Sequence, residues 1–358
     1  MTTTVRSFAK INLGLRIGAA RDDGFHDLLT VYQTIGLHDV IRVGVARGTG
    51  IEIRCEDPRV PRDESNTCFR IVERAMVALG AKGRVVIEIE KRLPVQGGLG
   101  GASANAVATL LGLERALKKF LPAAERLRIA AEVGSDLPLF LVGGTVLGVG
   151  RGEQVYPLED FASVACVVVT PEVGVSTPKA FGEWDRMMGA RGPGQERPAE
   201  LRSDGQPRAA VPTEAEAGGS NPLDKAKLTV SSGSDRMSEL GRGLSAWLSG
   251  LYSGAPSDLS RRGGRAENPL LWLVRAGIEN DFERVVFPEY PELREVKSAL
   301  LSVGAKYASL SGSGSTLYGL FGSREAAVRA AGRLRKAGWA AQVTSTLNRR
   351  AYWRRVVG

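Results

Sequence analysis

Apolar and polar residues alternate along several short stretches in the first half of the chain. The alternation covers residues 40–45, 51–55 and 85–89, and a further apolar stretch covers residues 145–149. Alternation with a period of two places every second side chain on one face, as in a strand that is buried on one side. We therefore predict strands at these four positions.

A helical spacing of apolar residues occurs in three other stretches, residues 66–79, 104–119 and 121–132. In the second of them, Ala106, Val107 and Leu110 fall on one side of a helix. Gly134 follows the third stretch as a helix stop signal. Residues 1–160 are therefore predicted to form a domain of mixed helices and strands.

A second domain is predicted from residue 161 onward, where an apolar run begins near residue 164. Its far end contains, in order, a helix at 292–303, strands at 307–310 and 316–321, a helix at 324–336 and a strand at 341–346. This order is typical of a split βαβ, ferredoxin-like domain. Two domains, 1–160 and 161–358, also agree with a length of 358 residues. The fold class that we predict is α+β.

Residues 189–268 differ in composition from both flanking regions. Of these 80 residues, 30 are Gly, Pro or Ser, and only Trp247 and Tyr252 are aromatic. Such a segment has too little apolar surface to offset the entropy of ordering the backbone, about 1–2 kcal/mol per residue. We predict a mobile polar insertion here, with one isolated helix at residues 237–251.

The chain is basic, because 48 lysine and arginine residues face 39 aspartate and glutamate residues, for a net charge of +9. A positive balance suits nucleic acid or an anionic small molecule as a partner, and it also follows from a generally basic proteome. The sequence contains no recognised nucleic-acid-binding module, and its aromatic residues, 6% of the chain, are not interleaved with a basic run. We therefore expect a small-molecule partner and no nucleic acid.

The three cysteines, Cys55, Cys68 and Cys166, are far apart and form no Cys-x-x-Cys motif. The two histidines, His26 and His38, are too few for a histidine-rich metal site. These features lend no support to a zinc or redox centre, and no metal ligand from the protein is predicted. The N-terminus has no apolar signal segment, and no apolar run reaches the about 18 residues of a membrane span. We expect a cytoplasmic chain with no membrane partner.

A glycine-rich loop joins the predicted strand at 85–89 to the predicted helix at 104–119. Four glycines stand within five positions, at Gly97, Gly98, Gly100 and Gly101. Glycines let the backbone approach a ligand closely, and the helix N-terminus behind them offers free N–H groups and the positive end of its dipole. A strand, a glycine loop and a helix in this order can hold a phosphate.

This loop matches neither common nucleotide-binding motif. It lacks the Lys and Ser or Thr of a Walker loop, and Ser103 stands where a dinucleotide fingerprint has its third glycine. A turn that only lets the helix pack is an equally good interpretation of the loop taken alone.

Phosphoryl transfer needs bound phosphates, neutralising charge and an oriented nucleophile, and several polar residues are candidates for these roles. Lys10 interrupts an apolar strand, and alternation places Asn12 on the same face. Lys10 is also compatible with an edge residue whose ammonium reaches solvent. Asp136 stands in a Gly-Ser-Asp turn before an apolar run, where it either caps a helix or takes part in chemistry.

Two loops add further candidates. Residues 311–315 form a second glycine-serine loop between two predicted strands, which is either an anion-binding nest or a flexible hairpin. Phe25 and His26 follow an Asp-Gly turn at Asp23 and Gly24. They project from the edge of this turn, unless Phe25 belongs to the core and His26 to the surface.

Together these motifs resemble those of the GHMP kinases, the superfamily of galactose, homoserine, mevalonate and phosphomevalonate kinases. The motifs occur here in the order of that family, at residues 9–13, 93–105, 134–138 and 310–314. Within the family, the segments 23–26 and 280–283 resemble the branch that acts on 4-diphosphocytidyl-2-C-methyl-D-erythritol. The resemblance covers residues 5–185 and 267–347.

This resemblance implies an N-terminal ribosomal-protein-S5-domain-2-like domain and a C-terminal ferredoxin-like domain. It also implies ATP-dependent phosphorylation of the 2-hydroxyl of 4-diphosphocytidyl-2-C-methyl-D-erythritol, in the non-mevalonate (MEP) route to isoprenoid precursors. Lys10 and Asp136 would be catalytic, with Asp136 accepting the hydroxyl proton and Lys10 stabilising the developing negative charge. Asn12 would bind near the reacting hydroxyl or phosphate.

The family pattern further implies the ligand contacts. ATP would lie along the glycine loop, with Mg²⁺ bridging its phosphates through few protein ligands, and Asn66 would line the adenine pocket. The residues expected to contact ATP are Asn66, Pro94, Gly97, Gly98, Leu99, Gly100, Gly101, Ala102, Ser103 and Asn105. The cytosine would stack between Phe25 and Phe181, with His26 at its edge and Thr177 as a further substrate contact. The diphosphate side would be supported by the second loop, at Ser311, Gly312, Ser313 and Gly314.

Four positions depart from the family pattern. Phe25 stands where tyrosine is common, Gln96 where a small residue is frequent, and Ala102 and Ala104 where glycine and serine are usual. These departures bear on the affinity for ATP rather than on the reaction. A mevalonate- or homoserine-type kinase and a catalytically silent binding protein are the alternatives, and the chain is expected to be a monomer or a homodimer.

Overall fold

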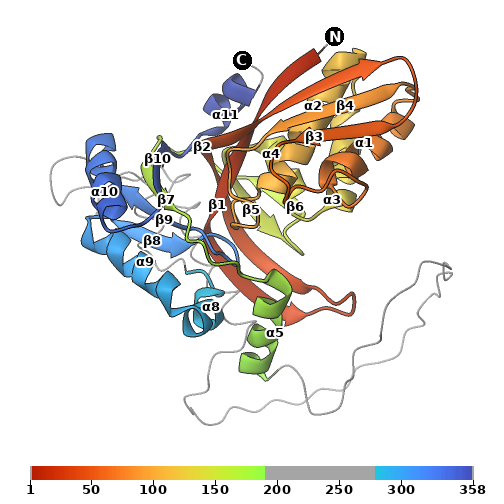
Figure 1. Ribbon diagram of the computed structural model, residues 1–358. Coiled ribbons are helices and arrows are strands. Elements are labelled where there is room, and N and C mark those ends of the chain that lie inside the picture. Colours follow the sequence, from red (N-terminus) through yellow and green to blue (C-terminus); the bar gives the residue numbers. More distant parts are fainter. Residues whose placement is uncertain (1, 190–278, 357–358) are drawn as a thin grey trace, which may run out of the picture.

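The structure is a computed structural model that describes residues 2–189 and 279–356. Apart from Gly189, the insertion predicted at 189–268 lies outside the described residues, as does the helix predicted at 237–251. Figure 1 shows two helix-and-sheet units side by side. Two long strands, β1 (Thr2–Ala20) and β2 (His26–Ala46), run between these units.

The first unit is built on a sheet that contains β1, β2, β3 (Ile51–Cys55), β4 (Arg84–Glu90), β5 (Thr145–Val149) and β6 (Gln154–Pro157). The strand order is β3-β4-β2-β5-β6, and β1 pairs with β2. Its helices are α1 (Thr67–Ala78), α2 (Gly101–Leu117), α3 (Ala123–Val133) and α4 (Leu137–Val142). Helix α2 lies on β1 and β2, so the N-terminus of α2 is held beside the β1–β2 hairpin.

The alternating stretches predicted as strands in this unit are strands. β3 and β5 have the predicted bounds, and β4 is longer by one residue at each end. The helix predicted at 66–79 is α1 with its two caps, Asn66 and Leu79. Helix α2 begins at Gly101, before the predicted start, because Gly101 and the glycines before it have a low helix propensity and so give no helical signal in the sequence.

The sequence predicted only a small part of β1 and β2, which span 19 and 21 residues. The residues of β1 are buried on both faces from Ser7 to Ile17, so apolar and polar residues do not alternate there. The register between the two strands also shifts at three places along β1. Both effects remove the period of two on which a strand prediction depends.

The second unit is a four-stranded antiparallel sheet of β7 (Ala165–Val169), β8 (Tyr307–Leu310), β9 (Leu317–Phe321) and β10 (Ala341–Ser345). The strand order is β10-β7-β9-β8. Helix α9 (Pro291–Ser302) precedes β8, and helix α10 (Arg324–Lys336) connects β9 to β10. This is the order of a ferredoxin-like domain, so that prediction is confirmed.

Three further helices were not predicted: α5 (Thr177–Met188), α8 (Glu283–Glu289) and α11 (Arg349–Val356). Helix α11 returns to the first unit, where Tyr352 OH donates to Phe140 O at 2.7 Å and Trp353 Nε1 donates to Val142 O at 3.0 Å. No helix among residues 2–189 and 279–356 is both long enough and apolar enough to cross a membrane.

Buried apolar residues form three clusters, and β1 contributes to each in turn. Val5 and Phe8 belong to the cluster under the first-unit helices, and Leu15 and Ile17 belong to the cluster of the second unit. Between them, Ile11 lies in a third cluster that contains residues of both sheets. The middle of β1 is therefore held at the junction of the two units.

Candidate active site

The glycine-rich loop between β4 and α2 requires glycine at two positions. Gly98 and Gly100 have φ angles of +75° and +68°, in the left-handed region that favours glycine. A Cβ at Gly98 would lie 2.1 Å from Ser311 O, and a Cβ at Gly100 would lie 3.1 Å from the side chain of Lys10. Because Gly98 and Gly100 have no side chains, the backbone of this loop can lie close to both Lys10 and the second glycine loop, residues 311–315.

The loop ends at the N-terminus of α2, which has no side-chain cap. Gly100 is the N-cap residue and makes no side-chain hydrogen bond. The first N–H groups of a helix lack partners inside the helix and carry the positive end of its dipole. Leu99 O accepts a hydrogen bond from Lys10 N at 3.0 Å, which fixes the loop to β1. Residues 97–103 therefore form a positively polarised turn that fits a phosphate group.

A buried carboxylate on β2 holds the beginning of this loop. Asp39 Oδ1 accepts hydrogen bonds from the backbone N–H groups of Arg92 and Leu93, both at 2.7 Å. Asp39 Oδ2 accepts from Lys91 Nζ at 2.6 Å and from Asn105 Nδ2 at 3.0 Å. Sequence reasoning missed Asp39, because nothing near it in the chain marks it. Asn105 is buried against Asp39, and its contact with ATP stays a prediction.

Lys10 and Asp136 meet in the structure. Lys10 Nζ lies 3.5 Å from Asp136 Oδ2 and donates a hydrogen bond to Asn12 Oδ1 at 2.7 Å. The lysine is almost fully buried, so it is no edge residue with its ammonium in solvent. Asp136 occupies the N-cap position of α4, but its side chain makes no capping hydrogen bond. Its carboxylate faces the lysine instead.

Tyr32 completes this group, and sequence reasoning missed it. Its hydroxyl donates to Asp136 Oδ1 at 3.0 Å, so both carboxylate oxygens have a partner from the β1–β2 hairpin. Tyr32 lies opposite Asn12 in the register of the two strands. Asn12 Nδ2 in turn donates to Thr30 Oγ1 at 2.8 Å. A prediction of this register would have revealed Tyr32, but the shifts along β1 hide it.

Burial shifts the titration of both neighbours of Asp136. It lowers the pKa of the Lys10 ammonium, and the attraction of Asp136 acts against this shift. It raises the pKa of the Tyr32 hydroxyl well above its ordinary range, and the charge of Asp136 adds to this shift. Tyr32 is therefore a neutral hydrogen-bond donor to the carboxylate at physiological pH.

Aromatic side chains lie at the far end of the same space. Phe25 is half exposed in the turn between β1 and β2, and the guanidinium of Arg151 lies 5.0 Å from its ring centroid. His26 stacks on Phe181 with ring centroids 4.8 Å apart and planes 11° apart. The His26 Nε2 atom lies 2.6 Å from Asp185 Oδ1. Sequence reasoning missed Arg151 and Asp185, since neither stands in a recognisable motif.

One cavity of about 570 Å³ connects the two ends of the site. It is lined at one end by Lys10, Asn12, Tyr32, Gly98, Gly100 and Asp136, and at the other by Phe25, His26, Arg151, Thr177, Phe181 and Asp185. A group that reacts beside Lys10 and a flat ring that lies beside Phe25 can therefore belong to one ligand.

The second glycine loop packs on the first. Ser311 Oγ donates to Gly98 O at 2.9 Å. The hydroxyls of Ser313 and Thr177 share a hydrogen bond of 2.7 Å, which ties the loop to the first residue of α5. Gly312 and Ser313 also line the cavity, so the loop lies at the site, where the sequence analysis expected it.

Both polar atoms of the Asn66 side-chain amide form hydrogen bonds within the protein. Its Oδ1 accepts from Cys68 N at 2.8 Å and caps α1, and its Nδ2 donates to Pro61 O at 2.6 Å. Both groups hold the turn before α1, and a contact of Asn66 with adenine stays a prediction.

Models of one protein family match both units. The model of the GHMP kinases N terminal domain matches residues 66–144, and the model of the GHMP kinases C terminal matches residues 270–339. With the ferredoxin-like sheet, the glycine loop at the N-terminus of α2 and the contact between Lys10 and Asp136, these matches define a kinase of the GHMP class.

Two relatives narrow this class. The chain is 32% identical to a 4-diphosphocytidyl-2-C-methyl-D-erythritol kinase of Solibacter usitatus over 366 residues, covering 100% of this chain and 95% of that protein. It is 34% identical to the protein of the same name in Rhodococcus jostii over 335 residues, covering 93% and 88%. The chain belongs to the family of 4-diphosphocytidyl-2-C-methyl-D-erythritol kinases.

Solved structures agree with this assignment. A crystal structure of 4-(cytidine 5'-diphospho)-2C-methyl-D-erythritol kinase is 25% identical with a TM-score of 0.64, covering 96% of this chain and 99% of that one. A homoserine kinase from Cytophaga hutchinsonii, 19% identical, has a TM-score of 0.63 and covers 97% and 95%. The second likeness concerns the fold alone, so the fold does not distinguish the substrates.

Proposed function

We propose that the chain transfers the γ-phosphate of ATP to the 2-hydroxyl of 4-diphosphocytidyl-2-C-methyl-D-erythritol, with Asp136 and Lys10 as the catalytic pair. The observation that carries this proposal is that the 3.5 Å Lys10–Asp136 pair lines the same cavity as Phe25 and Phe181. A substrate with a base at one end and a reacting hydroxyl at the other matches these two ends. Membership of the family supports the same substrate, and the step belongs to the non-mevalonate route to isoprenoid precursors.

The carboxylate of Asp136 accepts the proton of the substrate hydroxyl. The hydroxyl oxygen forms a bond to the γ-phosphorus while the bond from that phosphorus to the bridging oxygen of ADP breaks. Tyr32 donates to Oδ1 of the carboxylate and fixes its orientation. The Lys10 ammonium stabilises negative charge that develops on the transferred group. Asn12 holds the ammonium in place through its 2.7 Å hydrogen bond.

The glycine loop binds the ATP phosphates through the free N–H groups at the start of α2. Mg²⁺ lowers the negative charge of these phosphates when it is bound. Within residues 2–189 and 279–356, no group of three His, Cys, Asp or Glu side chains is placed to hold a metal ion. Mg²⁺ does not require such a group, because it is usually bound through one or two carboxylates together with the phosphates of the substrate, and Asp136 is the carboxylate at the Lys10 end of the cavity that could take part.

The aromatic end of the cavity binds the cytosine. Phe25 is 50% exposed and lines the cavity beside the Arg151 guanidinium, so its ring can stack on a base that enters there. His26 lies flat on Phe181, so a base on that same face of Phe181 would displace the imidazole ring. We propose that Phe25 stacks on the base, that His26 meets its edge, and that Phe181 supports His26 or the base from the other side.

A substrate panel with radiolabelled ATP tests this function. We expect phosphorylation of 4-diphosphocytidyl-2-C-methyl-D-erythritol and none of mevalonate or homoserine. The matched control is Asp136→Asn, which should lower kcat by at least about 10²-fold with little change in ATP binding, because it removes a positioned base. Turnover of mevalonate or homoserine in place of the cytidyl compound would reject the proposal.

A further inference from the structure

The segment Asn280–Glu283 is placed between the site and the second unit. Asn280 forms an isolated bridge with Leu15 of β1, and its neighbour Asp281 donates its backbone N–H to Leu15 O at 2.9 Å. Helix α8 follows directly, so these residues join β1 to α8. The segment is one of the motifs that resemble the kinase family, and none of its residues takes part in the phosphoryl transfer described above.

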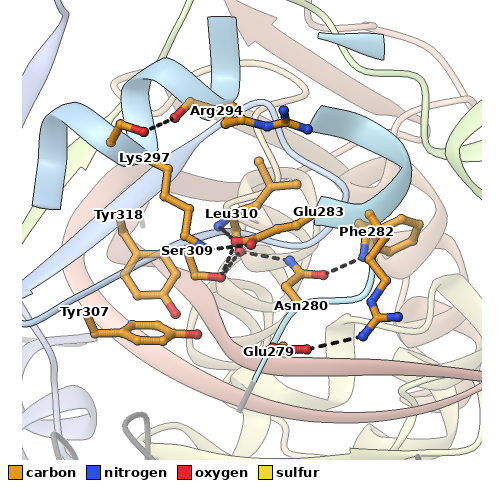
Figure 2. A network of polar contacts seen from close by, with 12 residues as sticks. Glu279, Asn280, Phe282, Glu283, Arg294, Lys297, Tyr307, Ser309, Leu310 and Tyr318 are labelled. Atoms are coloured by element: carbon orange, nitrogen blue, oxygen red, sulfur yellow. Dashed lines mark hydrogen bonds and ion pairs between the residues drawn. The ribbon is translucent and has the colours of Figure 1, made fainter. Parts of the chain in front are cut away.

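Both polar groups of the Asn280 side chain form hydrogen bonds, and Figure 2 shows those with Leu310 and Phe282. Its Nδ2 donates to Leu310 O at 2.9 Å and to Gly312 O at 2.7 Å. Its Oδ1 accepts from Phe282 N at 3.1 Å. The residue is only 2% exposed. The two donated hydrogen bonds hold the backbone of the second glycine loop at the point where it leaves β8.

Glu283 holds the same stretch of chain from the other side. Its Oε1 accepts from Ser309 Oγ at 2.8 Å and from Leu310 N at 3.0 Å. Its Oε2 forms an ion pair with Lys297 of α9. Figure 2 shows the side chains of Asn280 and Glu283 converging on Ser309 and Leu310. Together they hold both the N–H and the C=O of Leu310.

The loop that they hold lies against the catalytic lysine. Gly312 has φ +60°, and a Cβ there would lie 3.5 Å from Lys10 Nζ and 3.7 Å from Gly98 O. The two glycine loops are also joined by hydrogen bonds from Ser311 Oγ to Gly98 O at 2.9 Å and from Thr316 N to Gly97 O at 3.2 Å. A shift of the second loop would therefore move the phosphate-binding loop as well as the surroundings of Lys10.

The rest of the segment is anchored to elements that also line the site. Asp281 is buried, and its carboxylate accepts from Arg16 Nη1 at 2.9 Å and from Ile17 N at 3.0 Å. Phe282 packs edge-on against Phe181, with ring centroids 4.9 Å apart. The segment thus has fixed contacts with β1 and α5, which give Asn280 a rigid base from which to hold the loop.

We propose that Asn280 is a positioning residue for the phosphoryl transfer, which fixes the second glycine loop against the first and so keeps the ATP phosphates aligned with Lys10 and Asp136. It acts through the loop and touches no reacting atom. A role in the turn before α8 alone would need only Oδ1, which accepts from Phe282 N, and it leaves the two bonds from Nδ2 unexplained. This proposal rests on the kinase function proposed above. A misplacement of about 1 Å in a site of this kind costs about 10²-fold in rate.

Two substitutions separate the positioning of the loop from the formation of the turn before α8. Asn280→Ser keeps an oxygen that can accept from Phe282 N but loses both donors to the loop, and Asn280→Asp keeps the shape but sets a carboxylate against two carbonyl groups. The matched control is Lys297→Gln, which breaks the ion pair with Glu283 and leaves the Asn280 contacts intact.

The first measurement is steady-state kinetics on the full chain. Both Asn280 variants should lower kcat about 10-fold to 10²-fold, while the KM for the cytidyl substrate changes less than about threefold because the aromatic end is untouched. Lys297→Gln should keep the kcat of the unmodified chain. Unchanged kcat in folded Asn280→Ser and Asn280→Asp would overturn the proposal.

The second measurement does not depend on the reaction. Hydrogen exchange of the backbone amides of Ser311, Gly314 and Thr316 reports on the loop, because each donates a hydrogen bond within it or to the first loop. These amides should exchange faster in the Asn280 variants than in Lys297→Gln. Equal exchange in all three variants would overturn the proposal, whatever substrate the unmodified chain turns over.

Discussion

Lys10 is buried beside the partly exposed Asp136, and this position changes the titration of the lysine. Burial lowers the pKa of the lysine, and the carboxylate acts against that shift. The hydroxyl of Tyr32 stabilises the same carboxylate without carrying charge itself. The titration of Lys10 and of Tyr32 therefore depends on their contact with Asp136, and the effect of pH on the rate can be measured.

We expect the kcat/KM of the chain to fall on the alkaline side with an apparent pKa below 10.5, the ordinary value for lysine. Rising pH removes the proton from Lys10, and the lowered pKa of that group brings this loss to a lower pH. Tyr32 titrates above 10.0, so Tyr32→Phe should keep the alkaline limb while it lowers the rate. The measurement is a pH–rate profile of both chains, and a limb that vanished in Tyr32→Phe would contradict the assignment to Lys10.

Phe181→Ala should raise the KM for the cytidyl substrate. The substitution removes a ring that contacts both His26 and Phe282, so base recognition loses about 1–3 kcal/mol, or about 5-fold to 150-fold in affinity. The KM for ATP should stay the same, because the glycine loop is not in contact with this ring. Kinetics with each substrate varied in turn would measure the effect. A change in the KM for ATP alone would show that Phe181 takes part in binding ATP and not the cytidyl substrate.

Residues with an unusual local setting could be found from the sequence alone. Lys10 stands out as a charge within an apolar strand, and Asp136 as a carboxylate in a glycine turn before an apolar run. Tyr32 and Asp185 have ordinary surroundings in the chain, and only the pairing of β1 with β2 and the packing of α5 bring them to the site. The sequence therefore indicated Lys10 and Asp136, which lie 3.5 Å apart in the structure, but not Tyr32 and Asp185.

At the scale of elements, buried polar side chains hold the two glycine loops in place. Asp39 binds the backbone where the first loop leaves β4, and Asn280 does the same where the second loop leaves β8. A glycine-rich loop has high conformational freedom in the unfolded chain, so a fixed native geometry needs such contacts.

Asp39→Asn should loosen the first loop. It leaves the ammonium of Lys91 with a neutral partner in a mostly buried place, so the free energy of unfolding should fall by about 1–3 kcal/mol and the KM for ATP should rise. Urea unfolding and ATP kinetics measure the two effects. The control is Glu90→Gln on β4, whose partners Arg42 and Arg92 are exposed, and which should change stability by at most about 1 kcal/mol. A KM for ATP that rose equally in both variants would contradict the role of Asp39.

Elements with a regular pattern were predictable, and irregular ones were not. The strand β3 and the helix α10 have their predicted bounds because each has one buried face and so a clear period. Helix α4 is apolar along its whole length, and β1 is buried on both faces, so neither shows a period. The sequence predicted only a short part of β1, which carries Lys10, and no helix at α4, which adjoins Asp136.

At the scale of the whole molecule, the site depends on close contact between the two units. Gly98 of the first unit lies so near Ser311 of the second that a Cβ would overlap its carbonyl oxygen. Tyr318 OH also donates to Asn12 O at 2.8 Å, which ties the second sheet to β1. The relative position of the units therefore determines the geometry around Lys10.

Gly98→Ala should separate the effect of this contact from that of backbone strain. The control is Gly338→Ala, where φ is +91° but nothing lies within 4 Å of the new Cβ. Both variants should lose about 1–2 kcal/mol of stability from the left-handed backbone, and Gly98→Ala should lose more because of the overlap. Only Gly98→Ala should also lower kcat. Thermal unfolding and turnover measure both, and equal losses in the two variants would show that the contact is unimportant.

The passage of β1 through all three apolar clusters has a consequence for recombining relatives of this chain. A chimera joined at residue 160 would insert Leu15 and Ile17 of one parent into a second-unit core shaped by the other. Helix α11 would come from the other parent, so its Tyr352 would pack into a first-unit core of a different sequence. We therefore expect that grafting the turn at Phe25 together with α5, the elements proposed to bind the base, exchanges substrate preference with less disturbance of the cores than swapping halves of the gene.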